Sequence, residues 1–187
     1  MSKLIRTALL VVLGVVFVGS AAFASVPDPT TSICPTCVFY APGGFHDLIV
    51  QVKNQSNANI VGSNVQIDFG TNPIVWCATQ VHTGNVVSAT SDGLGQAHFP
   101  LRAGNCSNTG IIKIYADGVQ LCSYGYGPSG DLDGNLLVNV ADLSLWAITQ
   151  ASFPQDICGD YTCDTLVNVS DLGIFAEMQA FSNGCPP

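Results

Sequence analysis

The chain has 187 residues, a formal net charge of −8, and only five lysine and arginine residues against thirteen aspartate and glutamate residues. An acidic chain of this kind is not expected to bind nucleic acid, because the phosphates of nucleic acids attract basic surfaces. Hydrophobic residues make up 48% of the sequence, which excludes a disordered acidic tail and is enough for a folded core.

The first 24 residues have the pattern of a secretory signal peptide. Lys3 and Arg6 precede an apolar run over residues 8–18, and the small-residue motif Ala22-Phe23-Ala24 predicts cleavage after Ala24. The apolar run is short for a membrane span of about 20 residues, so a retained anchor is the less favoured interpretation. The mature chain keeps three basic and all thirteen acidic residues. We expect a protein that is secreted or held at the cell surface of a bacterium, with no membrane segment after cleavage.

Residues 25–125 predict a β-sandwich. Short runs of alternating apolar residues are separated by turn signals rich in glycine, asparagine and aspartate. In the run 64–70, Val65, Ile67 and Phe69 share one face. The sequence Ala116-Asp117-Gly118 is a hairpin signal between two runs. The other strands are expected within residues 48–53, 74–81, 84–101 and 110–124.

This part of the chain resembles the immunoglobulin-like modules of bacterial surface proteins. Three stretches carry the resemblance: NANIVGSNVQIDF (57–69), TSDGLGQAHFPL (90–101) and IKIYADGVQL (112–121). The resemblance covers roughly residues 45–123 and implies an immunoglobulin-like sandwich. It does not identify a ligand for that sandwich.

Eight cysteines follow the predicted signal peptide, and an even number in an exported chain predicts disulfides. Five cysteines lie before residue 126 and three after it, so full pairing needs at least one bridge between the two parts. The pairs Cys122–Cys185 and Cys158–Cys163 are the candidate bridges that involve the C-terminal cysteines. The Cys-x-x-Cys spacing at residues 34–37 also fits a zinc site or a thioredoxin-like site. A zinc site would need a second pair of ligands, and a thioredoxin-like site would need a strand before the motif and a helix after it. The sequence offers neither feature.

The composition changes at residues 123–130, a glycine-rich stretch with one proline that predicts a linker. Beyond it the sequence has no lysine or arginine, and one loop pattern occurs twice, 29 residues apart. The two copies are DLDGNLLVNVAD (131–142) and DYTCDTLVNVSD (160–171). Val138 and Val167, at position 8 of each copy, are expected to face inward and join the loops.

A helical apolar period follows each loop. The first helix, over residues 140–151, is expected to place Leu143, Trp146 and Ala147 on one face. The second, over residues 169–181, places Leu172, Phe175 and Ala176 on the equivalent face. Pro154 and the Gly-Cys-Pro-Pro end of the chain predict where the two helices stop.

The repeated loops place oxygen-bearing residues where an EF-hand loop places its calcium ligands, at positions 1, 3, 5, 7, 9 and 12. Carboxylates this close repel one another unless a cation lies between them. The alternative is a pair of aspartate- and asparagine-rich turns that cap two helices, but turn residues alone would not repeat at fixed offsets. Two calcium ions are therefore expected, the second weaker because Thr162 is a neutral ligand. The predicted ligands are Asp131, Asp133, Asn135, the Leu137 carbonyl, Asn139 and Asp142 in the first loop, and Asp160, Thr162, Asp164, the Leu166 carbonyl, Asn168 and Asp171 in the second.

Residues 126–187 resemble a dockerin module, in which each of two calcium loops is followed by one helix and ends in aspartate. The resemblance implies a small all-α domain held by calcium, a cohesin-type partner on a scaffold or cell-surface protein, and a role in extracellular attachment or assembly. Position 6, normally glycine, is here Leu136 and Thr165. Positions 10 and 11, which contact the cohesin and are often Ser-Thr, are Val140-Ala141 and Val169-Ser170. Calcium binding therefore carries over better than cohesin recognition.

The alternative function is that of a structural extracellular protein or a carbohydrate-binding module, whose calcium loops only stabilise the fold. Exposed aromatic side chains on one sheet face, such as Trp76 and Tyr115, would favour a polysaccharide ligand. The chain is not expected to be an enzyme, because it has no nucleophile elbow, phosphate loop or His-Glu-x-x-His motif. His82 or His98 with Asp68 is a conceivable catalytic pair, but His98 alternates with apolar residues as in a strand.

Overall fold

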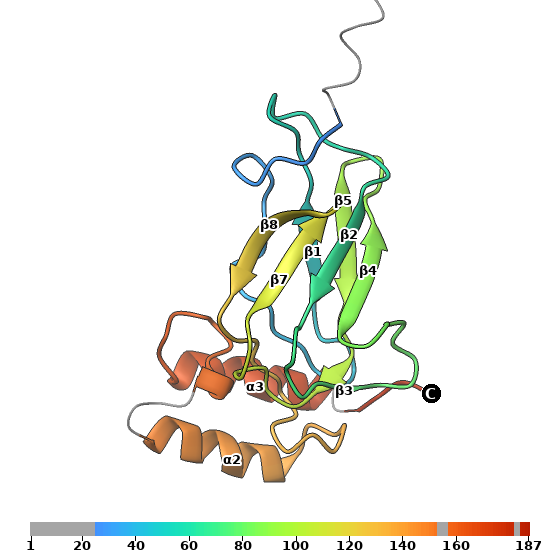
Figure 1. Cartoon of the computed structure of the whole chain (residues 1–187). Coiled ribbons are helices and arrows are strands. Elements are labelled where there is room, and N and C mark those ends of the chain that lie inside the picture. Colours follow the sequence, from blue (N-terminus) through green and yellow to red (C-terminus); the bar gives the residue numbers. More distant parts are fainter. Residues whose placement is uncertain (1–24, 153–156, 182–183) are drawn as a thin grey trace, which may run out of the picture.

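The computed structural model describes residues 25–152, 157–181 and 184–187, and it is mainly antiparallel β-sheet with two short helices (Figure 1). The predicted signal peptide and Pro154 lie outside the described residues. The elements are β1 (Asp47–Gln51), β2 (Asn64–Asp68), β3 (Val75–Trp76), β4 (Val86–Thr90), β5 (Gln96–Pro100), β6 (Ala103–Gly104), β7 (Ile112–Ala116), β8 (Val119–Tyr124), α2 (Val140–Ala151), the 3₁₀ helix η1 (Ile157–Gly159) and α3 (Val169–Phe181).

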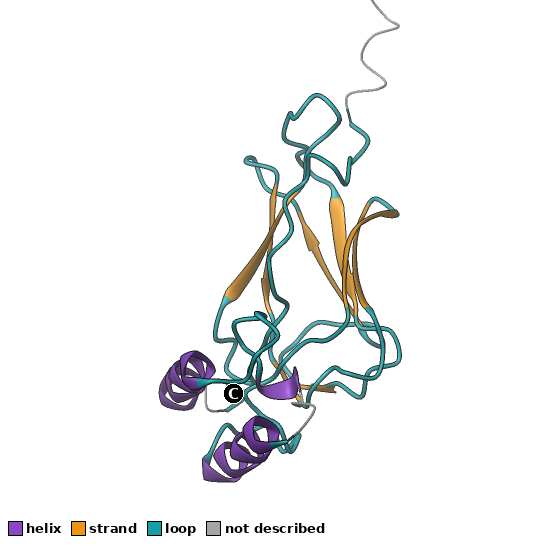
Figure 2. Ribbon diagram, turned by 90° about the vertical axis from the view of Figure 1, so that its left-hand side faces the viewer, coloured by secondary structure: helices purple, strands orange, loops and turns teal. Residues whose placement is uncertain are grey.

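The strands form two main layers, as a β-sandwich requires (Figure 2). One layer is a four-stranded sheet in the order β4-β2-β7-β8, and the other contains the pair β1-β5; a third, small sheet pairs β3 with β6. Side chains from both layers share one apolar core. Its members include Leu48, Val50, Val65, Ile67, Phe69, Val87, Ala97, Phe99, Ile112, Ile114, Ala116 and Leu121.

Local sequence signals explain the central strands. Val65, Ile67 and Phe69 are all fully buried, so the predicted alternation of strand β2 is confirmed. Strands β7 and β8 form the predicted hairpin, in which Asp117 and Gly118 have φ angles of 47° and 82°. Positive φ at both central residues is what a type I′ turn requires.

The strand predicted over residues 74–81 is much shorter than expected. Only Val75–Trp76 pairs as β3, and the chain then turns, with the Gln80 amide donating to the Cys77 carbonyl at 2.9 Å. The Cys77 side chain is fully buried and forms a disulfide, which takes the chain out of the sheet at this point.

The glycine-rich stretch after β8 is packed against the sandwich. Residues 127–130 are buried, and Gly127 and Ser107 exchange two backbone hydrogen bonds of 2.7 and 3.0 Å. A Cβ atom on Gly127 would lie 2.7 Å from Ile112 Cδ1 and 2.8 Å from the Val38 carbonyl oxygen. The glycine is needed for close approach, so this stretch is a fixed connection and its prediction as a linker is wrong.

Both helices lie at one end of the β layers (Figures 1 and 2). Their bounds agree with the helical periods of the sequence, and neither helix of the described residues is long and apolar enough to cross a membrane. Ala147 and Ala176 are exposed, contrary to expectation. The buried residues are instead Thr149 in the first helix and Met178 at the equivalent position of the second, 29 residues later.

A second apolar core holds the helices and loops together. Val138 and Val167 are 2% and 3% exposed and lie in it, as position 8 of each loop predicted. Its other buried members are Ala41, Trp146, Tyr161, Phe175 and Met178. Ala41 comes from the chain before β1, so this core includes a residue from the N-terminal part of the chain.

All eight cysteines form disulfides, but the candidate pairs Cys122–Cys185 and Cys158–Cys163 are wrong. No bridge joins cysteines that are close in sequence. Three of the four bridges connect the β-rich part of the chain to the part after residue 130. The two cysteines of the Cys-x-x-Cys motif belong to different bridges, so that motif is neither a zinc site nor a redox pair. The pairs are Cys34–Cys122, Cys37–Cys163, Cys77–Cys185 and Cys106–Cys158, with Cα atoms 5.5–6.6 Å apart.

Candidate metal centre

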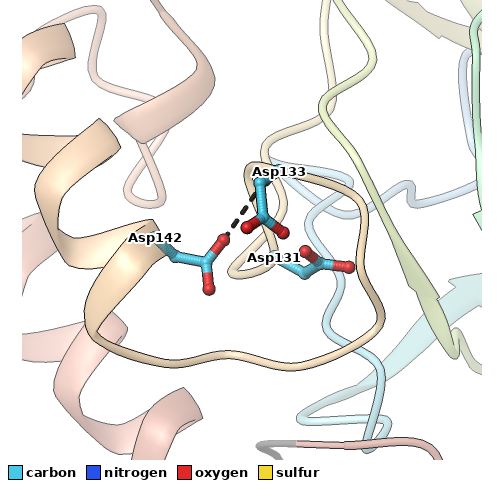
Figure 3. A group of neighbouring side chains, drawn as sticks. All are labelled: Asp131, Asp133 and Asp142. Atoms are coloured by element: carbon cyan, nitrogen blue, oxygen red, sulfur yellow. Dashed lines mark hydrogen bonds between the residues drawn. The ribbon is translucent and has the colours of Figure 1, made fainter.

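The first loop brings three carboxylates together. Figure 3 shows Asp142 reaching back from the first turn of α2 toward Asp131 and Asp133 on the loop. One oxygen from each side chain lies within 4.8 Å of the other two. Asp131 and Asp142 are fully buried, whereas Asp133 is exposed and opens the cluster to solvent.

Backbone amides hold these carboxylates in place. Asp131 accepts from the amides of Gly134 and Asn135 on one oxygen, at 2.9 and 3.1 Å, and from that of Leu136 on the other, at 2.7 Å. Asp142 accepts from two loop amides at 2.8 and 3.2 Å, and its second oxygen accepts from Asn139 N at 2.9 Å. The loop is therefore wound around its first and last residues.

The remaining predicted ligands of this loop are used mainly to shape it. Asn135 Oδ1 accepts from the Leu137 amide at 2.8 Å. Asn139 is the N-cap of α2, and its Oδ1 accepts from Ala141 N at 2.8 Å. The reciprocal bond from the Asn139 amide to Asp142 completes a capping box. The helix-capping interpretation of this sequence thus describes real contacts, alongside the carboxylate cluster.

The second loop repeats this architecture with a change of ligand at position 3. Asp160 and Asp171 are fully buried and accept from the amides of Thr165 and Asn168, each at 2.9 Å, as their counterparts do in the first loop. At position 3 the Thr162 hydroxyl lies 3.3 Å from an Asp160 oxygen and 3.2 Å from an Asp171 oxygen. A neutral hydroxyl therefore stands between the two buried carboxylates, where the first loop has Asp133.

The other two predicted ligands of the second loop also match their counterparts in the first. Asp164 Oδ1 accepts from the Leu166 amide at 2.9 Å, and Asn168 Oδ1 accepts from Ser170 N at 2.8 Å. The exposed positions 5 and 7 and the cap at position 9 therefore have the same local roles in both copies.

The loops also share their backbone conformation. Position 6 is left-handed in both, with φ angles of 65° at Leu136 and 72° at Thr165. Position 4 is left-handed as well, with φ angles of 72° at Gly134 and 54° at Cys163. Side chains with a Cβ disfavour this region, so the chain keeps the conformation against local preference. Two turns that arose independently would not share these four angles.

The cluster has an unbalanced negative charge. The ion pairs found among the described residues both involve His98, far from the loops in sequence, and no cationic side chain pairs with the loop carboxylates. Burial raises the pKa of Asp131 to about 6, and the neighbouring carboxylates of Asp142 and Asp133 act in the same direction, against hydrogen bonds from backbone amides. A bound cation would offset this repulsion.

The donor set fits a hard cation. Carboxylate, amide, hydroxyl and backbone carbonyl oxygens are the groups that calcium binds, usually about six to eight at a time. The cysteines near the loops are oxidised, so they offer no thiolate to a softer metal. Asp131, Asp133 and Asp142 would hold an ion in the first loop. Among the described residues no equivalent group of three carboxylates converges in the second loop, where Thr162 stands in place of Asp133 and the other predicted ligands include Asp160, Asp164 and Asp171.

Three contacts to the loops were not predicted from the sequence. The Tyr126 hydroxyl donates to Asp160 Oδ2 at 2.6 Å, and the Asn105 amide donates to the Asp131 carbonyl at 2.8 Å. Gly104 lies so close that a Cβ there would overlap the Asp131 carboxylate. For the Tyr126 contact, the only signal in the sequence is an aromatic residue within the glycine-rich stretch. The contacts of Asn105 and Gly104 depend on where strand β6 lies, and the sequence carries no signal for them.

The other candidate chemistry in the β layers is not assembled. His98 Nδ1 lies 2.5 Å from Asp47 Oδ2, and its Nε2 lies 3.9 Å from Asp92, so its partners are not Asp68. Trp76 packs edge-on against the core residue Phe69, with ring centroids 5.4 Å apart, and is only half-exposed. Its other ring contact is with His82, stacked at 5.1 Å, and Tyr115 is likewise half-exposed.

Comparison with known proteins leaves the chain without an assigned family. No family model, no curated protein and no solved structure matches it.

Proposed function

We propose that this is a secreted or cell-surface protein whose two repeated loops bind two calcium ions, and that the dockerin-like C-terminal part attaches the immunoglobulin-like part to a cohesin-type partner outside the cell. The observation that carries the calcium proposal is the cluster of Asp131, Asp133 and Asp142. One oxygen from each lies within 4.8 Å of the others, and no cationic side chain among the described residues pairs with them. The second loop repeats the buried carboxylates Asp160 and Asp171. Calcium would neutralise both groups and fix the start of each helix.

Exposed apolar side chains favour a docking role. Leu137 and Leu166, at position 7, are 53% and 56% exposed, and Val140 and Val169, at position 10, are 70% and 77% exposed. These are equivalent residues of the two copies, so each calcium loop presents the same apolar pair to solvent. Surface residues of this kind, in a part of the chain with no lysine or arginine, fit a partner with an apolar centre and basic residues around it.

A purely structural role is the second candidate, and the disulfides favour it. Three bridges join the loops and helices to the β layers, and Asn105 pairs with Asp131 across the same boundary. In that case calcium would stabilise the fold and bind no partner. If the sandwich itself bound a polysaccharide, calcium would likewise only stabilise the fold.

Calcium titration of the mature chain, residues 25–187 with disulfides intact, tests the metal proposal. Calorimetry is expected to show two ions, the first bound more tightly. Asp142→Asn is expected to abolish the tighter site and Asp171→Asn the weaker one. Asp92→Asn, a surface carboxylate that also accepts two backbone amides, is the matched control and should leave both sites intact. No heat of binding at millimolar calcium, with an unchanged melting temperature, would remove the proposal.

A surface variant separates docking from a structural role. Val140→Glu with Val169→Glu is expected to prevent binding to an immobilised cohesin module while calcium affinity and melting temperature stay unchanged. Ala147→Glu with Ala176→Glu, exposed on the same helices, is the control. Calcium binding without any cohesin binding by the unmodified chain would favour the structural role.

A further inference from the structure

We propose that the Cys37–Cys163 disulfide controls metal binding by the second loop, so that calcium affinity and the redox state of this bridge are coupled. The inference rests on the calcium binding proposed above. It concerns one position, the fourth of the loop, where the two copies of the repeat differ in chemistry but not in conformation.

Cys163 lies inside the second loop. It is flanked by the predicted ligands Thr162 and Asp164, and its equivalent in the first loop is Gly134. Both residues have left-handed φ angles, 54° at Cys163 and 72° at Gly134. Glycine reaches this region freely, whereas a residue with a Cβ is disfavoured there and other contacts must offset the cost. At Cys163 the disulfide is one of those contacts.

The other end of the bridge is anchored firmly. Cys37 is 7% exposed and precedes Val38, a fully buried member of the sandwich core. The Cα atoms of Cys37 and Cys163 are 5.7 Å apart across 126 residues of sequence. Position 4 of the loop is therefore attached to a buried residue beside the sandwich core.

This attachment acts on the groups that orient the first ligand. The amides of Asp164 and Thr165, the two residues after Cys163, donate to the carboxylate of Asp160 at 3.2 and 2.9 Å. If position 4 were released, these donors would lose their fixed direction, and a metal would have to order them at the cost of chain entropy. The oxidised bridge thus prepares the loop for the ion.

Coupling between two sites is reciprocal, so the ion must also protect the bridge. Reduction by a dithiol transfers two electrons and two protons to Cys37–Cys163. The bond between the two sulfurs breaks, two thiols form, and the dithiol closes to a cyclic disulfide. Bound calcium favours the oxidised loop and therefore shifts the thiol–disulfide equilibrium of this bridge toward the disulfide. Reduction therefore leaves Cys163 as a thiol and lowers the affinity of the second loop for calcium.

The test uses the mature chain and two matched pairs of substitutions. Cys37→Ser with Cys163→Ser removes the proposed control, and Cys34→Ser with Cys122→Ser removes a bridge that lies wholly among the β layers. The first variant is expected to bind calcium about tenfold more weakly at one site only, as the ordering of one or two residues predicts. The second is expected to bind both ions as the unmodified chain does.

A measurement on the unmodified chain covers the case in which a variant does not fold. The chain is equilibrated in a buffer with a fixed ratio of reduced to oxidised dithiothreitol, the thiols are trapped by alkylation, and peptide mass spectrometry reports the oxidised fraction of each bridge. Millimolar calcium, compared with magnesium, is expected to raise the ratio of disulfide to dithiol at Cys37–Cys163 about tenfold and that at Cys34–Cys122 hardly at all. Equal ratios with both ions, or an equal rise at both bridges, would overturn the inference. If two ions bind but neither bridge responds, the inference fails and calcium binding stands; if none binds, both fail.

Discussion

The Tyr126 hydroxyl donates a 2.6 Å hydrogen bond to Oδ2 of Asp160, the first residue of the second loop. Burial, together with the neighbouring Asp160, raises the pKa of the Tyr126 hydroxyl well above its usual range, so it remains a donor at any physiological pH. The tyrosine comes from the connection after β8, and it orients a buried carboxylate that has no cationic partner among the described residues. In proteins that bind metals, such outer contacts hold the ligands in position.

Tyr126→Phe removes this hydrogen bond without changing the ring. We expect the free energy of unfolding of the metal-free protein to fall by about 1–2 kcal/mol, because a buried carboxylate loses a donor. Calcium affinity at the weaker site should fall by about tenfold. Denaturant unfolding and calorimetry measure the two effects. Tyr124→Phe, which removes a 2.6 Å bond to the Pro35 carbonyl instead, is the control and should spare calcium binding.

Thr165→Gly should stabilise the protein. Thr165 is exposed and has a φ angle of 72°, so its side chain contributes little packing and disfavours the conformation it occupies. We expect the free energy of unfolding to rise by about 1 kcal/mol. Leu166→Gly, at the next residue and outside the left-handed region, is expected to lower it by a similar amount. A loss of stability in Thr165→Gly would contradict the assigned loop conformation.

Gly104→Ala should disturb the first loop from outside. A Cβ at Gly104 would overlap the Asp131 carboxylate, which is buried and cannot move away freely. We expect a loss of about 1–3 kcal/mol in the free energy of unfolding and weaker calcium binding at the tighter site. Gly125→Ala, with no atom within 4 Å of the added Cβ, is the control. Thermal unfolding with and without calcium reports both quantities.

The pH dependence of the metal-free protein should carry the signature of Asp131. Its pKa is raised by burial from about 3.8 in the unfolded chain to about 6 in the folded protein. Between these values the folded state holds a proton that the unfolded state has released. This group therefore stabilises the fold below about pH 4, and that contribution is lost as the pH rises through about 6.

The difference in unfolding free energy between the unmodified chain and Asp131→Asn isolates this contribution. It should change by about 1–3 kcal/mol between pH 4 and pH 7 in the absence of metal. Calcium competes with the proton, so its affinity should increase over the same interval. A difference that is independent of pH would show that Asp131 is not the group that titrates.

Several structural features could be predicted because they depend on short stretches of sequence. The alternation in β2, the hairpin at Asp117-Gly118 and the two helical periods each concern residues only a few positions apart. The repeated loops belong to the same class, because each is closed by hydrogen bonds within twelve residues. Local geometry fixes these features, so their residue types are sufficient to identify them.

Long-range packing decided the rest. The Cys37–Cys163 bridge spans 126 residues, and the burial of the stretch around Gly127 depends on Val38 and Ile112. Neither relationship leaves a pattern in neighbouring residues, so sequence patterns alone predict other disulfide pairs and a linker at residues 123–130. By itself the sequence determined that two acidic loops would form, each followed by a helix. Only the tertiary structure decided that they are fastened to the β layers, because disulfides and close glycine contacts form between segments that folding alone brings together.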